Sequence, residues 1–175
     1  MTAAVLSIGG NLGDRLATLQ SAVDGLGTRT TAISPIFETA AWGGVEQGDY
    51  LNAVLLVSDP AFEPMDWLTF AHQLEQHAGR VRDVRWGPRT LDVDVIDCAG
   101  PDGEPIVSDD PVLTLPHPRA HERAFVLVPW LATDADAQLR VAGKLVRVAD
   151  LVSQLPAAEI SSVRRTEFEL IGAGL

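Results

Sequence analysis

The sequence predicts an α+β sandwich built as a single domain, residues 1–175. Three observations support this class. Apolar, β-rich segments alternate with two amphipathic helical segments, both helical segments have recognisable start and stop signals, and 46% of the residues are hydrophobic. A chain of 175 residues can bury a sizeable core, so one domain is the simplest interpretation.

The first half of the chain alternates strands and helices. Residues 3–8 are an apolar strand that ends in a glycine turn, and a helix follows that Gly13 or Asp14 opens. The apolar positions of this helix recur at helical spacing: Leu16, Leu19, Val23 and Leu26. Residues 30–37 and 51–58 are β-rich, and a long glycine-containing loop, residues 40–49, separates them.

A second helix begins at Pro64, because proline is favoured in the first helical turn, and Gly79 is its stop signal. Its apolar face comprises Trp67, Leu68, Ala71, Leu74 and Ala78. A strand around Asp92 follows. The resulting order, β-α-β-β-α-β, is that of the ferredoxin-like sandwich. We therefore expect a ferredoxin-like core with additional C-terminal elements.

The remaining chain predicts those additional elements. Residues 101–118 are rich in proline and aspartate and read as loop, with a short helix over residues 119–123 and a helical segment over residues 126–132. Residues 144–155 suggest a strand that runs into a short helix, and residues 162–170 suggest a final strand.

Composition excludes several classes of function. The net charge of -11 opposes non-specific attraction to nucleic acid or to an anionic membrane. The single cysteine, Cys98, allows no internal disulfide, and the N-terminus has no basic region followed by an apolar secretory core. No apolar run approaches the length of a membrane span. We expect a cytoplasmic protein that binds neither nucleic acid nor membrane.

Two aspartates mark a candidate metal site. The run from Leu91 to Val95 alternates apolar and acidic residues, so Asp92 and Asp94 project from the same face of a strand. Aspartate is depleted in strands, and two of them on one face need a reason. Carboxylates are the hard oxygen ligands that Mg²⁺ shares with substrate phosphates. The alternative is a solvated strand face without a metal.

Four arginines precede this strand in an otherwise acidic chain: Arg80, Arg82, Arg85 and Arg89. Guanidinium groups bind phosphate oxygens in pairs, so the arginines and the aspartates together favour a nucleoside triphosphate with its metal. The turn at Gly87-Pro88 is placed to present Trp86 and Arg89. A solvated loop neutralised by nearby acids is the competing interpretation.

Several motifs resemble one known family. Residues 85–96 read R-W-G-P-R-T-L-D-V-D-V-I, which closely resembles the signature of the 6-hydroxymethyl-7,8-dihydropterin pyrophosphokinases of folate biosynthesis. Residues 8–13 resemble the family's opening I-G-S-N-L-G, residues 50–53 its Y-L-N-A, residues 115–119 its L-P-H-P-R and residues 123–127 its R-x-F-V-L. The resemblance covers about residues 5–129, and the later tail matches loosely.

The resemblance implies an activity and its substrates. Members of the family transfer pyrophosphate from ATP to the hydroxymethyl group of 6-hydroxymethyl-7,8-dihydropterin and release AMP. It also implies the same ferredoxin-like core, two Mg²⁺ ions bound with ATP, and a monomer as the working form. The purpose of the C-terminal tail is not implied by the family.

The resemblance also implies the roles of individual residues. The catalytic residues are Arg82, Arg89, Asp92 and Asp94, and the last two hold the metal. The pterin-binding residues are Thr39, the backbone of Ala40, Trp42, Asn52 and Phe125, with the two aromatic rings as stacking faces. The ATP-binding residues are Glu75, Arg82, Trp86, Arg89, His117 and Arg123.

Other interpretations stay open from the residues alone. His117 could bind a metal, although no second histidine or cysteine stands at a zinc-like spacing, so a hydrogen bond to phosphate is the favoured role. A metal-dependent phosphodiesterase or nuclease could also use two aspartates with arginines, and it would release nucleotide without a pterin. A ferredoxin-like sensor would bind ATP without forming AMP.

Overall fold

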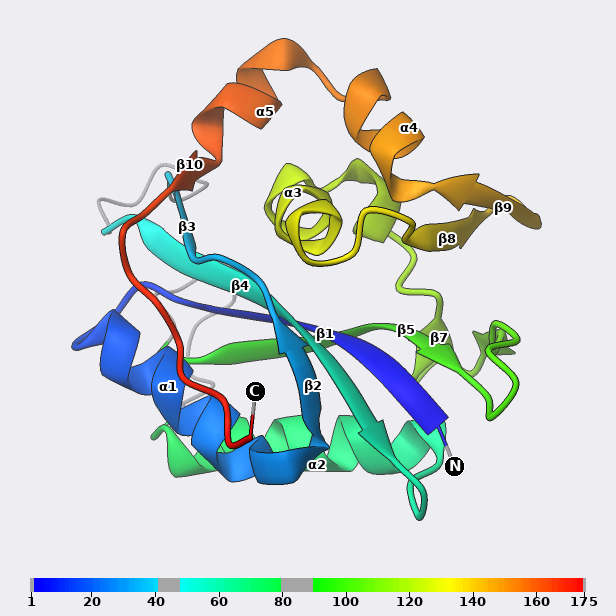
Figure 1. The fold of residues 1–175 in the computed structure, drawn as a ribbon, viewed down its shortest axis with the longest axis horizontal. Coiled ribbons are helices and arrows are strands. Elements are labelled where there is room, and N and C mark those ends of the chain that lie inside the picture. The colour runs from blue at the N-terminus through cyan, green and yellow to red at the C-terminus, as the bar shows by residue number, and fades with distance from the viewer. Residues whose placement is uncertain (1, 41–47, 80–89, 175) are drawn as a thin grey trace.

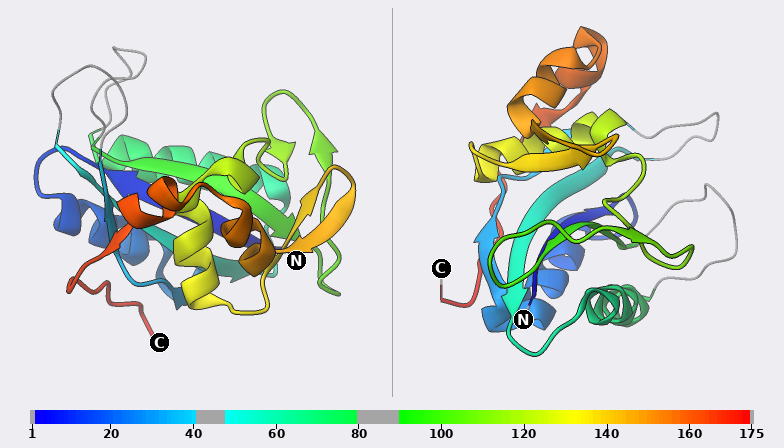
Figure 2. Two further views of the ribbon diagram at one scale, coloured as in Figure 1. Left: turned by 90° about the horizontal axis from the view of Figure 1, so that it is seen from above. Right: turned by 90° about the vertical axis from the view of Figure 1, so that its right-hand side faces the viewer.

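A computed structural model describes residues 2–40, 48–79 and 90–174 (Figure 1). Its central sheet is antiparallel, and helices cover both faces (Figures 1 and 2). The sheet strands are β1 (Thr2–Gly10), β2 (Thr30–Ile33), β3 (Phe37–Thr39), β4 (Tyr50–Asp59), β5 (Asp92–Ala99) and β10 (Arg164–Arg165). The principal helices are α1 (Arg15–Leu26), α2 (Pro64–His77) and α3 (Ala124–Thr133).

The strand order confirms the ferredoxin-like prediction. β1 lies in the middle, with β4 on one side and β5 on the other. Both β2 and β3 pair with the far side of β4, because the predicted strand over residues 30–37 is divided into two short strands. With β2 and β3 counted together as the second strand, the order across the sheet is fourth, first, third, second.

Two layers of core lie on the two faces of this sheet. Alternate residues of β4 divide between them: Leu51, Ala53, Leu55 and Val57 face α1 and α2, whereas Val54 faces α3. Trp67 is fully buried in the first core, and Trp130 is 3% exposed in the second. The alternation has a period of two, as a strand buried on both faces requires.

The predicted helix signals are confirmed. Asp14 is the N-cap of α1, and its side chain accepts a hydrogen bond from the backbone N–H of Ala17 at 3.0 Å. α2 begins at Pro64 with a reciprocal capping box between Glu63 and Asp66. It ends at the predicted glycine, since Gly79 has a φ of +73°, a region that favours glycine. No described helix is long and apolar enough to cross a membrane.

The C-terminal region adds short elements. They are the 3₁₀ helix η2 (Ala120–Glu122), the strands β6 (Ser108–Asp109), β7 (Thr114–Leu115), β8 (Gln138–Val141) and β9 (Lys144–Arg147), and the helices α4 (Val148–Gln154) and α5 (Ala157–Ser162). Another 3₁₀ helix, η1 (Gly27–Arg29), lies earlier in the chain, directly after α1. The predicted strand-to-helix segment over residues 144–155 is confirmed as β9 and α4. The sequence did not predict β8 or α5.

The predicted final strand over residues 162–170 is wrong for most of its length. Only Arg164 and Arg165 pair with β3, as β10. Beyond them the chain is held by single contacts, such as Thr166 with the backbone of Ile36, and forms no further ladder among the described residues. The apolar and acidic alternation from Glu167 to Leu170 resembles a strand, but a strand also needs a neighbouring edge that continues in register.

Candidate active site

The predicted site residues on the sheet stand in two adjacent rows. Gly9, in the central strand β1, lies opposite Asn52 of β4 and opposite Asp92 of β5. Directly opposed residues of antiparallel strands project from the same face. Asn52 and Asp92 therefore share one face, separated by two strand spacings, or about 10 Å. This face is the one that α3 covers, because Val54, two residues beyond Asn52, packs in the α3 core.

The second row begins two residues further along. Ser7 of β1 lies opposite Val54 of β4 and Asp94 of β5, so Asp94 points to the same face as Asp92. The register thus agrees with the prediction that the two aspartates lie on one face. The regular pairing of β5 with β1 ends at Val95, where the apolar and acidic alternation also ends. The register shifts between Val5 and Leu6, so Ile96 is an extra residue in β5.

Asn52 is fixed in place by its neighbours. Its Nδ2 donates a hydrogen bond of 2.8 Å to Oγ1 of Thr39, and both side chains are buried. A Cβ added to Gly9 would lie 2.7 Å from Oδ1 of Asn52, so only glycine leaves room for the amide. Gly9 therefore supports the site because it has no side chain.

Asp94 has charged neighbours of both signs. Oδ2 of Asp94 lies 3.1 Å from Nη1 of Arg123, the residue that precedes α3. Burial and the charge of Asp92 raise the pKa of Asp94, while His117 and Arg123 act in the opposite direction. The two carboxylates thus lie close enough for the charge of Asp92 to act on Asp94.

His117 is held by two hydrogen bonds, one made by its backbone and one by its ring. Its backbone N–H donates to the carbonyl of Ile96 at 2.7 Å, which ties it to β5. Its Nδ1 lies 3.2 Å from the backbone N–H of Arg119 and accepts from it. Burial lowers the pKa of His117, which favours the neutral ring. Because Nδ1 accepts, the remaining proton is on Nε2, which can donate to a ligand.

Glu75 has a structural contact that the sequence did not predict. It is 3% exposed, and its Oε1 accepts a hydrogen bond of 3.0 Å from the backbone N–H of Val93. β5 is an edge strand of the sheet, so this contact fixes the outer side of the strand that carries the aspartates.

A cavity of about 290 Å³ lies beside β5. It brings together the predicted residues Glu75, Asp92, Asp94 and His117. Its other lining residues come from α2, from β5 and from the segment around β7: Leu68, His72, Val93, Val95, Val112, Leu113, Thr114 and Pro118. The sequence did not mark Leu68, His72 or Val112 as site residues, because an apolar or helical residue carries no signal of the cavity it faces.

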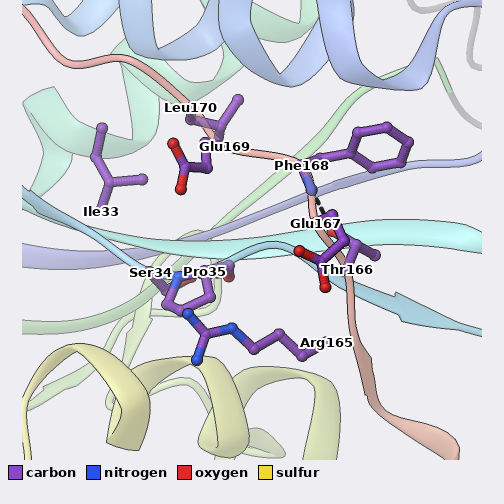
Figure 3. A pocket seen from close by; sticks show the side chains of 9 residues that line it. All are labelled: Ile33, Ser34, Pro35, Arg165, Thr166, Glu167, Phe168, Glu169 and Leu170. Atoms are coloured by element: carbon purple, nitrogen blue, oxygen red, sulfur yellow. Dashed lines mark hydrogen bonds between the residues drawn. The ribbon is translucent and has the colours of Figure 1, made fainter.

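A larger cavity, of about 410 Å³, lies elsewhere, between the β2–β3 connection and the C-terminal tail (Figure 3). Residues such as Ser34, Arg165 and Phe168 line it, and none of the predicted catalytic residues that the structure describes does so. Its size alone does not make it the reaction site, whereas the smaller cavity contains the carboxylate pair.

The other predicted residues either do not line the cavity beside β5 or lie outside the described part of the chain. Phe125 is half-buried in the first turn of α3, and the guanidinium of Arg123 lies 5.6 Å from its ring centroid. Ala40 is exposed at the end of β3. The predicted residues Trp42, Arg82, Trp86 and Arg89 lie outside the described residues.

The geometry of this site can be compared with known proteins. The sequence model of the 7,8-dihydro-6-hydroxymethylpterin-pyrophosphokinase (HPPK) family matches residues 5–135. The chain belongs to this family. The match includes every residue predicted for the site, and it ends before β8, so the elements from β8 onward lie outside the family's common region.

Mycobacterial relatives match further along the chain. The 2-amino-4-hydroxy-6-hydroxymethyldihydropteridine pyrophosphokinase of Mycobacterium tuberculosis is 53% identical over 176 residues, which span 97% of this chain and 94% of the relative. The protein of the same name from Mycobacterium leprae is 54% identical over 175 residues, which span 97% of this chain and 92% of the relative. These alignments extend into the C-terminal region.

Solved structures support the fold. The crystal structure of wild-type Plasmodium falciparum HPPK-DHPS with SDX-DHP aligns with a TM-score of 0.60 at 12% identity. The alignment covers 87% of this chain and 44% of that one, so the chain spans less than half the length of this structural relative. At this identity the likeness concerns the fold alone.

Proposed function

We propose that the protein transfers pyrophosphate from ATP to the hydroxymethyl group of 6-hydroxymethyl-7,8-dihydropterin, giving AMP and the pterin diphosphate of folate biosynthesis. In this proposal it is an ATP-dependent diphosphotransferase. Family membership supports it, and one structural observation carries it: on a single sheet face, the anchored amide of Asn52 lies about 10 Å across the strands from the carboxylate pair on β5. An amide can hydrogen-bond to the edge of a pterin, and a carboxylate pair can hold the cation of a triphosphate, so the reaction requires both groups in one site.

The pterin end of the site is the part of the first row on β4, at Asn52. The contact with Thr39 uses one amide hydrogen, and a second hydrogen and the carbonyl oxygen can read a ring edge that both donates and accepts. Phe125 and Trp42 are the proposed stacking faces, and the backbone of Ala40 is a further edge contact. These aromatic and backbone roles rest on the family resemblance.

The nucleotide end is the cavity beside β5. Its apolar lining residues, such as Leu68 and Val112, suit the flat base of ATP. Its carboxylates suit the cation that would bind together with the phosphates. Nε2–H of His117 and the guanidinium of Arg123 are the described donors for phosphate oxygens. Arg82, Arg89 and Trp86 are proposed to complete this end.

Magnesium fits the donor set of the site. Asp92 and Asp94 offer two hard carboxylates on one face, and burial together with the charge of Asp92 raises the pKa of Asp94. Among the described residues no group of three or more acidic, histidine or cysteine side chains could hold a metal. This suits Mg²⁺, which takes few protein ligands and completes its shell with water and phosphate. Bound there, up to two ions would neutralise phosphate charge and orient the triphosphate.

In the proposed reaction the hydroxymethyl oxygen attacks the β-phosphorus of ATP and its proton passes to water. The bond between the β-phosphorus and the oxygen that bridges to the α-phosphorus breaks, and AMP leaves with that oxygen. The protein positions the two substrates and stabilises the charge that develops on the phosphoryl oxygens. His117 and Arg123 donate to those oxygens, with Arg82 and Arg89 in the same proposed role. No covalent intermediate with the protein is required.

We also propose that the protein works as a monomer in the cytoplasm, with ATP and the pterin as its only partners. The single cysteine, Cys98, is buried, and burial raises its pKa to about 12, which suits a structural thiol. The strongly negative net charge agrees with the absence of a nucleic-acid role. Sedimentation of the purified chain would test the monomer.

The decisive experiment follows AMP. The purified protein is incubated with ATP and Mg²⁺, with and without 6-hydroxymethyl-7,8-dihydropterin, and the products are separated by chromatography. AMP and pterin diphosphate in equal amounts, only when the pterin is present, would support the proposal. Nucleotide release without the pterin would instead indicate a phosphodiesterase, and ATP binding without any AMP would indicate a sensor.

A further inference from the structure

The C-terminal tail, residues 163–174, runs back along the edge of the sheet to α1 (Figure 1). It pairs with β3 through β10, and both the N–H and the hydroxyl of Thr166 donate to the carbonyl of Ile36, at 2.9 and 3.0 Å. Further along, the side-chain amide of Gln20 makes two hydrogen bonds with the backbone of Ile171, at 2.8 and 3.0 Å. The tail is therefore fastened at both ends of its course.

One side chain of this tail belongs to a charged cluster next to the proposed pterin end of the site. Nη2 of Arg164 lies 3.3 Å from Oε2 of Glu38 and 3.1 Å from Oδ2 of Asp49. From the other side, Nη1 of Arg15 lies 3.0 Å from Oε1 of Glu38 and 2.6 Å from the carbonyl of Asp49. We call these four residues, Arg15, Glu38, Asp49 and Arg164, the edge cluster.

The edge cluster joins the two strands that carry the anchored amide. Glu38 is the neighbour of Thr39 in β3, and Asp49 directly precedes β4, which carries Asn52. Thr39 lies opposite Tyr50, at the last rung of the β3–β4 pairing. Any separation of the two strands at this end would begin at that rung and would weaken the bond between Thr39 and Asn52.

Electrostatics indicate which side chains keep this end closed. Glu38 and Asp49 are like charges that share the same arginine nitrogen, so they repel each other unless a cation lies between them. Isolated surface ion pairs contribute little, but a network of several charges contributes more. Arg15 belongs to α1, whereas Arg164 comes from the region beyond the family's common part, which ends at residue 135.

We propose that the C-terminal tail is a strap for the pterin end of the sheet and that Arg164 is a positioning residue for pterin binding. Arg164 acts through Glu38 and Asp49, whose separation it prevents, and thereby keeps Thr39 and Asn52 in hydrogen-bonding register. This inference rests on the proposed function for the identity of the ligand. The contacts of the strap itself do not depend on it.

The test compares Arg164→Ala with a matched control, Arg165→Ala. Arg165 is the next residue of the same short strand and makes no ion pair with any described residue. The purified variants are titrated with 6-hydroxymethyl-7,8-dihydropterin and, separately, with a non-hydrolysable ATP analogue and Mg²⁺. We expect Arg164→Ala to weaken pterin binding about 3- to 10-fold, as the loss of two networked ion pairs allows. ATP analogue binding and the control variant should be unchanged.

Two further variants separate positioning from general stability. Arg164→Lys keeps the charge and should recover most of the pterin affinity. Adding Glu38→Gln to Arg164→Ala should also recover affinity, because it removes the repulsion that the arginine offsets. Unchanged pterin affinity in Arg164→Ala, an equal loss for both ligands, or no recovery by Glu38→Gln would overturn the proposal.

A readout without ligand separates this inference from the proposed function. Amide hydrogen exchange at Thr39 and Tyr50, which face each other at the last rung of the β3–β4 pairing, should be faster in Arg164→Ala than in the native protein and the control, while exchange in β5 is unchanged. If the native protein binds no pterin, the proposed function fails, and the exchange result still decides whether the strap exists. Equal exchange in all variants would overturn the strap.

Discussion

At the scale of single residues, the site consists of groups whose environment fixes their chemistry. Asn52 is oriented by Thr39 and by the absence of a side chain at Gly9. His117 is presented as a donor because its Nδ1 is occupied by a backbone N–H. Asp94 is opposed by Asp92 and paired with Arg123. The orientation of Asn52 and the ion pair of Asp94 depend on neighbours that are distant in sequence, and each of these two residues leads to a test.

The first prediction concerns pterin recognition. Asn52→Ala should weaken pterin binding about 5- to 150-fold, because an unpaired buried ligand group costs about 1 to 3 kcal/mol. Binding of ATP with Mg²⁺ should stay nearly unchanged, since Asn52 lies two strands, or about 10 Å, away from Asp92. Calorimetric titration of both ligands would measure this, and equal losses for both would show that Asn52 supports the fold instead.

The second prediction concerns the carboxylate pair. Asp94→Ala removes one proposed metal ligand, and we expect pterin-dependent AMP formation to fall about 100-fold or more, as when a charge-stabilising group leaves an active site. The fold should survive, because Asp94 is not part of either apolar core. Asp136→Ala, an exposed aspartate outside the site, is the matched control. Near-normal turnover by folded Asp94→Ala would remove Asp94 from the site.

At the scale of elements, β5 carries both the two site aspartates and a shift in register. Beyond this shift lies Asp97, which is half-buried. Its Oδ1 has no hydrogen-bond partner among the described residues. Burial raises the pKa of Asp97 to about 7, although the N–H of Cys98 and the charge of Arg140 act in the opposite direction. Folding therefore keeps this acid mostly protonated at pH values below about 7.

The third prediction follows from the sign of this shift. The folded pKa of Asp97 lies above the unfolded value of about 4, so the folded state binds the proton more tightly. The stability that this group contributes falls as the pH rises from about 4 to about 7 and then stays low. Asp97→Asn should raise the free energy of unfolding by about 1 to 3 kcal/mol at pH 8, and by less at pH 4.5.

Urea unfolding of the native protein and Asp97→Asn at both pH values would test it. Asp134→Asn, whose carboxylate only caps a surface turn, serves as the control for the loss of one charge. An Asp97→Asn effect that is the same at pH 8 and at pH 4.5 would show that ionisation of Asp97 does not affect folding.

At the scale of the whole molecule, the two cores share one sheet. Neighbouring residues of β4 pack into opposite layers, as Val54 and Leu55 do, so neither layer can lose the strand without the other. Each layer contains one buried tryptophan, Trp67 or Trp130. This arrangement supports the prediction of a single domain, which stays a prediction until unfolding is measured.

The fourth prediction tests that single domain. The indole N–H signals of Trp67 and Trp130 should disappear at the same urea concentration in an NMR titration, because both report one cooperative transition. Leu55→Ala, in the core that contains Trp67, should destabilise the protein by about 2 to 5 kcal/mol. Both signals should then disappear at the same lower urea concentration. If only the Trp67 signal disappeared at a lower urea concentration, the two layers would unfold as separate units.

Much of the core and part of the site could be predicted from sequence. The period of two in β5 placed Asp92 and Asp94 on one face, and the start signals at Asp14 and Pro64 located both helices, because these patterns depend on local geometry. The final strand over residues 162–170 could not be predicted correctly, since strand formation needs a partner edge. The lining of the cavity by Val112 likewise has no local signal.

The sequence by itself determined the order of the core elements up to β5, the same-face pair on β5 and the family, because periodicity, capping and motifs depend on neighbouring residues. Only the tertiary structure decided which side chains meet across strands. It placed Asn52 and Asp92 on either side of Gly9, His117 beside Asp94, and Arg164 between Glu38 and Asp49. The physical reason is that register and chain return depend on contacts between distant segments, which no local pattern encodes.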